Sequence, residues 1–267
     1  MKNHLEQVLA ADTIQFKEEE LTFMLANIGS VDPELRDGII YSLFYRGFSE
    51  GFLTPSQIQT ITKTIINENY LYRDIDQSES DGVFTRSFTA LLGTLILTYD
   101  KQPPYKAYLS ETDKEWLFKN SQDYLIQEHD YRGYVPIKGW AHSIAHGGDF
   151  LGSAVGHEDF PRIQVENVLK VLEIVLLTSR PTPLIDDEEQ RLVPVIVRLL
   201  ETDKLPVEIL SIWLENLLAS LPVYRGELPH FYTRLSVKLF LFHLYFKLKA
   251  KNLLTTNVAS IISDYCQ

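Results

Sequence analysis

The sequence predicts an all-α protein, because apolar residues recur with helical spacing along almost the whole chain. Two clear helix starts stand at Asp32-Pro33 and Thr54-Pro55, where a capping side chain precedes a proline at the first helical position. No alternating apolar and polar segment indicates a strand. Residues 193–197 are strand-like in composition, but Pro194 argues against a central strand.

The helices are expected in a regular order after these starts. After Asp32, Leu35, Ile39 and Leu43 form an apolar face, and after Thr54 another apolar stripe begins at Ile58. Ser110 with Asp113 resembles a capping box. The remaining helices are expected over residues 82–99, 110–127, 139–154, 161–178, 186–201, 206–220, 228–250 and 254–265.

The spacing of these helices indicates a repeating arrangement. Helix pairs begin near residues 32, 81, 139, 186 and 228, which is close to the spacing of two-helix HEAT-type repeats. We expect antiparallel helix pairs stacked in a HEAT-like, right-handed superhelical array or in an irregular α-α array. No linker divides the chain, so a single all-helical domain is expected over residues 1–267.

Composition and charge exclude several classes of function. The chain has 25 Lys and Arg against 36 Asp and Glu, and this net charge of -11 repels nucleic acids and anionic membranes. The single cysteine, Cys266, excludes an internal disulfide and a cysteine-based zinc site. The apolar run 239–246 is too short to cross a bilayer. Within it, His243 is expected to be a buried, hydrogen-bonded core histidine and not a ligand. With no signal peptide at the N-terminus, we expect a cytoplasmic protein.

One segment concentrates residues that carry chemistry. Between Gly139 and Gly156 the only formal charge is Asp149, which is typical of a helix buried on nearly all sides. At 100° per residue, His142, His146 and Asp149 fall within about 60° of one another on such a helix. Three interpretations are open: a structural polar network, a ligand pocket, and a site for a divalent metal. The metal ligands would be His142, His146, Asp149 and His157.

Charged partners for this stripe are expected from nearby and from more distant segments. The preceding loop offers Glu128, Asp130 and Arg132, while Arg86 and Arg191 come from other helices. The candidate ligand-binding residues are Arg86, Glu128, Asp130, Arg132, Trp140, His142, His146, Asp149 and Arg191.

The same segment resembles a known family. Gly139-Trp140-Ala141-His142 through His146 and Asp149 is similar to the signature of the domain-of-unknown-function 2785 family of bacterial proteins. Glu128-x-Asp130-x-Arg132-Gly133, Arg86-Ser87-Phe88 and Glu189-x-Arg191-Leu192 extend the resemblance over about residues 32–200. Since the family has no established activity, the resemblance implies a fold and the location of a site, but no reaction.

Two functions follow as hypotheses. The first is a binding or scaffold module, with a polar pocket or groove around the Gly-Trp-Ala-His-x3-His-x2-Asp segment that takes a small polar ligand, a peptide or a protein. The alternative is a metal-dependent hydrolase, in which a divalent metal on His142, His146 and Asp149 activates water and Glu128 or Asp130 is the general base. The sequence favours binding and leaves open whether the chain is an enzyme.

Overall fold

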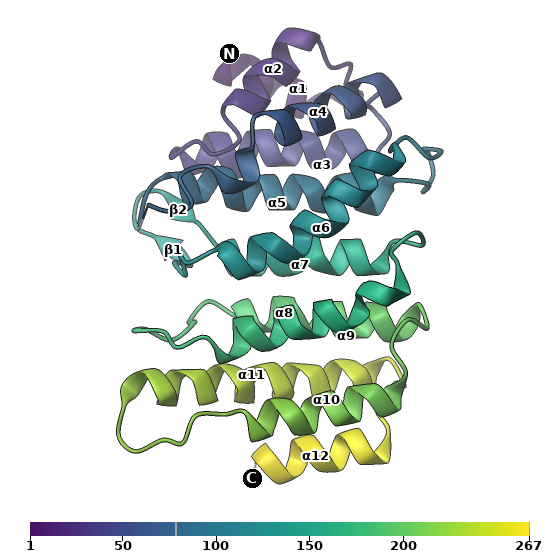
Figure 1. Cartoon of the computed structure of the whole chain (residues 1–267). Helices are drawn as coiled ribbons and strands as arrows, with labels where there is room; N and C mark the ends of the chain where they lie inside the picture. The colour runs from purple at the N-terminus through teal and green to yellow at the C-terminus, as the bar shows by residue number, and fades with distance from the viewer. Residues whose placement is uncertain (78, 267) are drawn as a thin grey trace. The chain divides into compact units, whose positions relative to one another are not determined.

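The computed structural model describes residues 1–77 and 79–266, and it is mostly helical (Figure 1). The all-α prediction is confirmed, since the described residues hold only one small sheet, of two antiparallel strands. A HEAT-like superhelical arrangement stays a prediction. Within the described part of the chain, no helix has both the length and the apolar character needed to cross a membrane.

The chain divides into two compact units, one over Met1–Ala154 and the other from Val155 onward. Each unit is described by itself below. The expectation of a single domain over residues 1–267 stays a prediction, and its last residue, Gln267, lies outside the described residues.

The first unit is built from helices and one hairpin. Its elements are α1 (Lys2–Leu9), α2 (Glu18–Ala26), the π-helix η1 (Glu34–Tyr41), α3 (Ser42–Ser49), α4 (Pro55–Asn67), the short 3-10 helix η2 (Tyr70–Tyr72), α5 (Gly82–Tyr99), α6 (Glu111–Gln127), β1 (Tyr134–Val135), β2 (Gly139–Trp140) and α7 (Ser143–Gly156). The helices α1 and α2 precede the first helix that the sequence patterns identified.

The expected helix starts are confirmed by their capping hydrogen bonds. Asp32 Oδ1 accepts from the backbone N–H of Glu34 at 3.0 Å, at the start of η1. Thr54 and Gln57 form a reciprocal capping box at the start of α4, with distances of 3.2 and 2.9 Å. Ser110 Oγ accepts from the backbone N–H of Asp113 at 3.2 Å, so α6 also begins where a cap was expected.

Helix α5 forms the centre of the first unit. It packs against α3, α4, α6 and η2, and it is buried on nearly every side. Phe84 and Phe88 are fully buried, and burying a side chain of this size contributes about 1.5–3 kcal/mol of hydrophobic stabilisation. The site described below lies against this helix.

The helix expected over residues 139–154 begins later than predicted. Gly139 and Trp140 form β2, and α7 starts at Ser143. The reason is backbone conformation: Gly139 and His142 have φ values of 76° and 47°, which a right-handed helix does not allow. The lack of charge that suggested a longer helix reflects burial alone.

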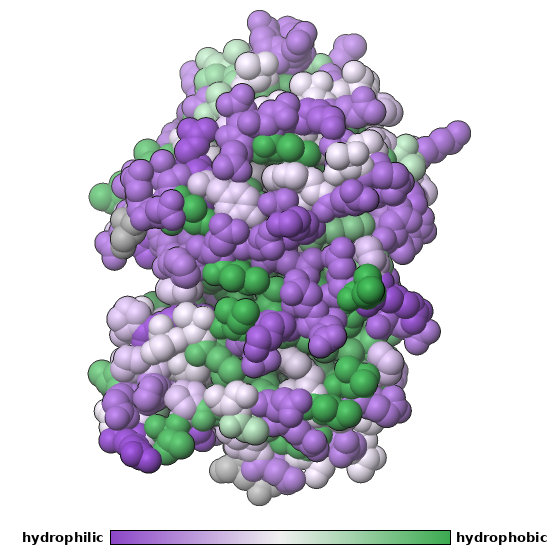
Figure 2. All heavy atoms as spheres, in the orientation of Figure 1, coloured by the Kyte–Doolittle hydropathy of each residue, from purple (hydrophilic) through white to green (hydrophobic). Residues whose placement is uncertain are grey.

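In its described residues, the second unit has helices and loops but no strand. Its elements are η3 (Arg162–Gln164), α8 (Val165–Leu177), α9 (Glu188–Glu201), α10 (Val207–Ala219), α11 (Leu228–Ala250) and α12 (Thr256–Cys266). The long helix α11 packs against α8, α9 and α12. Residues 193–197 belong to α9, as the proline argument required. On the face drawn in Figure 2, hydrophilic side chains cover most of the surface and apolar ones form separate patches.

Candidate functional site

A buried arginine holds the hairpin in place. Arg36, in η1, has no exposed surface, and its Nη2 donates to the carbonyl oxygens of Lys138 at 2.8 Å and Trp140 at 3.3 Å. Its guanidinium lies 4.4 Å from the ring centre of Phe84 and 4.8 Å from that of Phe88, both in α5. Burial lowers the pKa of Arg36, which is still a cation because an arginine pKa begins so high. The hairpin is therefore fixed to two helices.

The hairpin holds two residues in the left-handed region. Gly139 has a φ of 76°, and a Cβ there would lie 2.8 Å from Pro33 Cβ and 3.1 Å from Arg36 Nη2. Only glycine fits this position without a shift of its neighbours. Ile137, at the turn, has a φ of 71° and is 92% exposed. A β-branched residue is strained in this conformation, and here its side chain gains no burial in return.

A row of rings leads from the surface of the hairpin inward. Tyr134 and Trp140 are 56% and 42% exposed, and their ring centres lie 5.0 Å apart in an edge-to-face arrangement. The ring centres of Trp140 and His142 lie 4.3 Å apart, and those of His142 and the buried His146 lie 5.8 Å apart. Although His142 precedes α7, its carbonyl accepts from the N–H of His146, which keeps the two imidazoles one turn apart.

Ser87 of α5 fixes the tautomer of His146. Its hydroxyl hydrogen is donated to the carbonyl of Ala141, while Ser87 Oγ lies 2.7 Å from His146 Nδ1. A hydroxyl has only one hydrogen, so Nδ1–H of His146 is the donor in the second bond. The neutral ring therefore carries its lone pair on Nε2. The Phe88 ring packs edge-to-face on the same imidazole at 5.3 Å, so its orientation is fixed as well.

Arg86 and Glu128 form a buried ion pair below the hairpin loop. Arg86 Nε and Nη2 donate to the two carboxylate oxygens of Glu128 at 2.7 and 2.8 Å, and both side chains are almost fully buried. Burial alone would lower the pKa of Arg86, but the Glu128 carboxylate reverses this effect and raises it. Glu128 also accepts from the backbone N–H of Asp130 at 2.9 Å. With every contact satisfied inside the fold, this pair anchors the loop.

The neighbouring residues Asp130 and Arg132 form a second ion pair, and Arg132 Nη2 also donates to the Ser80 carbonyl at 2.9 Å. Arg132 Nε and Nη2 donate to the Asp130 carboxylate at 2.8 and 2.5 Å, and this hydrogen bonding raises the pKa of Arg132. The main chain of the pair connects it to the histidine segment. The N–H of His142 donates to the Arg132 carbonyl at 3.1 Å, and Ser143 Oγ donates to the Asp130 carbonyl.

Of the other predicted site residues, only Asp149 shares a helix with His146. Asp149 is half-buried in α7, whereas His157 and Arg191 belong to the second unit. His157 Nδ1 accepts from the backbone N–H of Asp159 at 3.1 Å, so one of its nitrogens is used in a turn. Arg191 lies in α9 and lines a pocket between α9 and α11.

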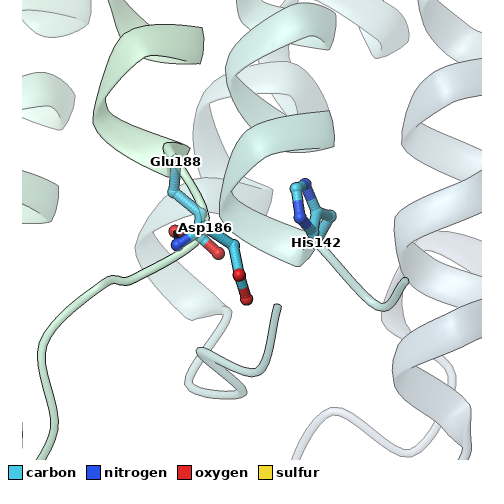
Figure 3. A group of neighbouring side chains, drawn as sticks. All are labelled: His142, Asp186 and Glu188. Atoms are coloured by element: carbon cyan, nitrogen blue, oxygen red, sulfur yellow. Dashed lines mark hydrogen bonds between the residues drawn. The ribbon is translucent and has the colours of Figure 1, made fainter. Parts of the chain in front are cut away.

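Figure 3 draws His142 just before α7, and it draws Asp186 and Glu188 at the start of α9. The last two, in the second unit, offer carboxylate oxygens within 4.8 Å of each other. In the described part of the first unit, His142, His146 and Asp149 do not offer three ligand atoms within that distance. In the described residues, these three side chains alone thus do not form the three-ligand geometry of a catalytic zinc ion.

The motifs and their placement agree with the comparison against known families. The model of the family described as "Protein of unknown function (DUF2785)" matches residues 71–246. The chain belongs to this family. The match to DUF2785 covers α5, the hairpin and α7, and therefore the site, but not Arg36. Neither a curated protein nor a solved structure matches the chain.

Sequence reasoning missed three residues that shape the site in this DUF2785 member: Arg36, Ile137 and the role of Ser87. Arg36 shares a helical stripe with Ile40 and Phe44, at four-residue spacing, and this is a readable sign that a charged residue faces the interior. The strain at Ile137 depends on a turn conformation that the sequence does not indicate.

Proposed function

We propose that the chain is a binding protein, and that its site is the hairpin surface formed by Tyr134, Ile137 and Trp140 together with His142 and His146. The partner is a peptide or protein segment. One observation carries this proposal: Ile137 is both strained and 92% exposed on a hairpin that is otherwise tightly held. A conformation that costs free energy and exposes an apolar side chain is typical of a functional surface.

The surroundings of Ile137 support the same function. Tyr134 and Trp140 are the residue types most often found at the energetic centres of protein interfaces, and both are substantially exposed. The hairpin is held by Arg36 and by an ion pair from Lys138 to Asp81 at 2.7 Å. A surface fixed before binding loses little conformational entropy when the partner arrives.

The histidines supply the polar part of the site. When neutral, His146 presents its lone pair on Nε2, because Ser87 holds the hydrogen on Nδ1. The two imidazoles thus give the site a polar part with a fixed orientation, next to the apolar surface of the hairpin.

The experiment is a selection from a phage-displayed library of random peptides on the full chain. Enriched peptides are then measured on the variants Ile137→Asn and Trp140→Ala, and on the control Ile185→Asn. Ile185 is 77% exposed in the second unit. We expect the two hairpin variants to lose at least about tenfold in affinity, as for residues at an interface centre, and the control to keep it. Peptides that bind all four proteins equally would contradict the proposal.

A metal-dependent hydrolase is the second candidate, and one observation favours it. Ser87 Oγ accepts a hydrogen bond from Nδ1–H of His146. Metal-binding histidines regularly have such a hydrogen bond at the ring nitrogen that does not bind the metal. The test is the metal content of protein purified without an affinity tag, measured by mass spectrometry. One equivalent of a divalent metal, lost in His146→Ala, would support the hydrolase, and protein free of metal would contradict it.

A further inference from the structure

The second unit contains a pocket whose charged lining residues are all basic. It lies between α9 and α11, and its volume is about 360 Å³. These two helices pack against each other (Figure 1). Volumes of this order are typical of small-molecule sites. The residues that carry the argument are Arg191, Val193, Pro194, His243, Phe246 and Lys247. No Asp or Glu is among the described residues that line it.

The polar side of the pocket comes mainly from α11. Lys247 is exposed in the last turn of this helix, and His243 lies one turn earlier. In the described part of the chain, neither side chain makes a hydrogen bond or an ion pair. The expectation that His243 is a buried, hydrogen-bonded core residue is wrong. Phe240 and Leu244 take the core-facing positions of α11, which leaves His243 half-buried at the edge.

The apolar side of the pocket exposes an aromatic ring. Phe246 is 66% exposed, an unusual exposure for so large an apolar side chain. Opposite it, α9 contributes Val193 and Pro194. The proline has no backbone N–H, so its ring is a purely apolar surface at this point of the helix.

Electrostatics favour an anion in this pocket. The protein as a whole carries a net charge of -11, so a pocket lining whose charged residues are all basic differs from the average of the chain. The pocket lies near the start of α9, where the helix dipole favours anions, and near the end of α11, where the dipole opposes them. Since these two effects partly cancel, the side-chain charges decide the preference.

We propose that the pocket between α9 and α11 binds a small aromatic carboxylate. The ring of the ligand packs on Phe246 and Pro194, and its carboxylate faces Lys247. An aromatic body matches the exposed phenyl ring of Phe246, and a carboxylate matches the ammonium of Lys247. This site is independent of the hairpin surface, so either proposal can fail alone.

The experiment compares three probes that share one apolar body: 1-naphthoate, neutral 1-naphthalenemethanol and cationic 1-naphthylmethylamine. Binding to the full chain is followed by calorimetry and by chemical shifts in nitrogen-15 spectra. We expect 1-naphthoate to bind most tightly, the amine to bind most weakly, and the shifts to centre on α9 and α11. Added salt should weaken the binding of naphthoate and leave that of the neutral probe unchanged.

Variants separate local contact from the general charge of the unit. Lys247→Gln should weaken naphthoate about two- to fivefold, as expected for one exposed charge pair, without changing the neutral probe. Phe246→Ser should weaken both probes, by about tenfold. The matched control is Lys249→Gln, two residues along the same helix and outside the lining. Equal binding of the acid and the alcohol, or an equal effect of the two lysine variants, would overturn the proposal.

Discussion

Buried cations are used differently in the two compact units. In the first unit, Arg86 meets the Glu128 carboxylate in an ion pair that joins α5 to the hairpin loop. In the second unit, Lys204 donates to the carbonyls of Val155 and His157 at 2.9 and 2.6 Å, in the last turn of α7 and directly after it. The first arrangement joins segments that are distant in sequence, and the second satisfies carbonyl groups at a helix end.

The buried acidic residues of the two units also differ in their partners. Residues 1–154 hold 13 Lys and Arg against 22 Asp and Glu, a formal charge of -9, and the remainder of the chain holds 12 against 14, or -2. The first unit nevertheless pairs its buried Glu128, whereas Glu189 of the second unit is 2% exposed and its Oε1 has no hydrogen-bond partner among the described residues. Burial raises the pKa of Glu189. These two carboxyls thus differ in their partners, although both are almost fully buried.

The largest effect is expected at the ion pair of the first unit. Glu128→Ala leaves the Arg86 guanidinium buried without its carboxylate, and this should lower the free energy of unfolding by about 3–5 kcal/mol. Urea denaturation measures the loss. The control is Glu50→Ala, which removes a more exposed i,i+4 partner of Arg46 and should cost less than about 1 kcal/mol. Similar losses in both variants would show that the buried pair has no special part in the fold.

A smaller loss of stability is expected when a glycine is replaced by alanine, either in the hairpin or in a loop of the second unit. Gly139→Ala adds a Cβ at a φ of 76° and against Pro33, so we expect a loss of about 2–4 kcal/mol from strain and crowding together. Gly226 has a φ of 112° with nothing within 4 Å, so Gly226→Ala adds strain alone, about 1–2 kcal/mol. Calorimetric melting of both variants gives the comparison. An equal loss would mean that the hairpin is loosely held.

In the second unit, Glu189→Gln should increase stability. The raised pKa means that protonated Glu189 is favoured by folding. The stability it contributes is present below its ordinary value of 4.5 and is lost as the pH rises through the folded-state pKa. The neutral amide avoids this loss, so a gain of about 1 kcal/mol is expected at pH 7 and none at pH 4. Urea denaturation from pH 4 to pH 8 tests this, and a variant less stable than the natural chain at pH 7 would show that the carboxylate is paired.

The smallest effect concerns exposed isoleucines in the two units. Asparagine tolerates the left-handed conformation, so Ile137→Asn should raise the free energy of unfolding by about 0.5–1 kcal/mol. Ile185→Asn, at a residue that is also exposed but has no positive φ, should stay within about 0.5 kcal/mol of the natural chain. Thermal unfolding of both variants measures these changes in stability. A destabilised Ile137→Asn would contradict the claim that the backbone of Ile137 is strained.

The helices could be predicted from the sequence because their causes are local. Asp32, Thr54 and Ser110 cap helices through residues two or three positions away, and a pattern of this length is visible in the chain. The boundaries of α5 and α11 agree with the expected ranges 82–99 and 228–250 for the same reason.

The site could be predicted only in part. The sequence indicated the segment around His142 and His146, and the two rings do lie close together. It placed Gly139 in a helix, because two-residue strands and positive φ values leave no periodic signal. The ligand-binding roles assigned to the candidate residues stay predictions. The burial of Arg36 depends on Phe84 and Phe88, about fifty positions away, and only the folded chain brings them together.

The hydrogen bonds of Arg36 also have a consequence for folding kinetics. They join residues separated by 102 and 104 positions, so closing this loop has a large entropic cost. Contacts of such long range are expected to form after the rate-limiting step, once the local helices have assembled. Gly139→Ala should then speed unfolding in stopped-flow experiments while leaving the refolding rate nearly unchanged. The hairpin would be the last part of its unit to form and the first to open.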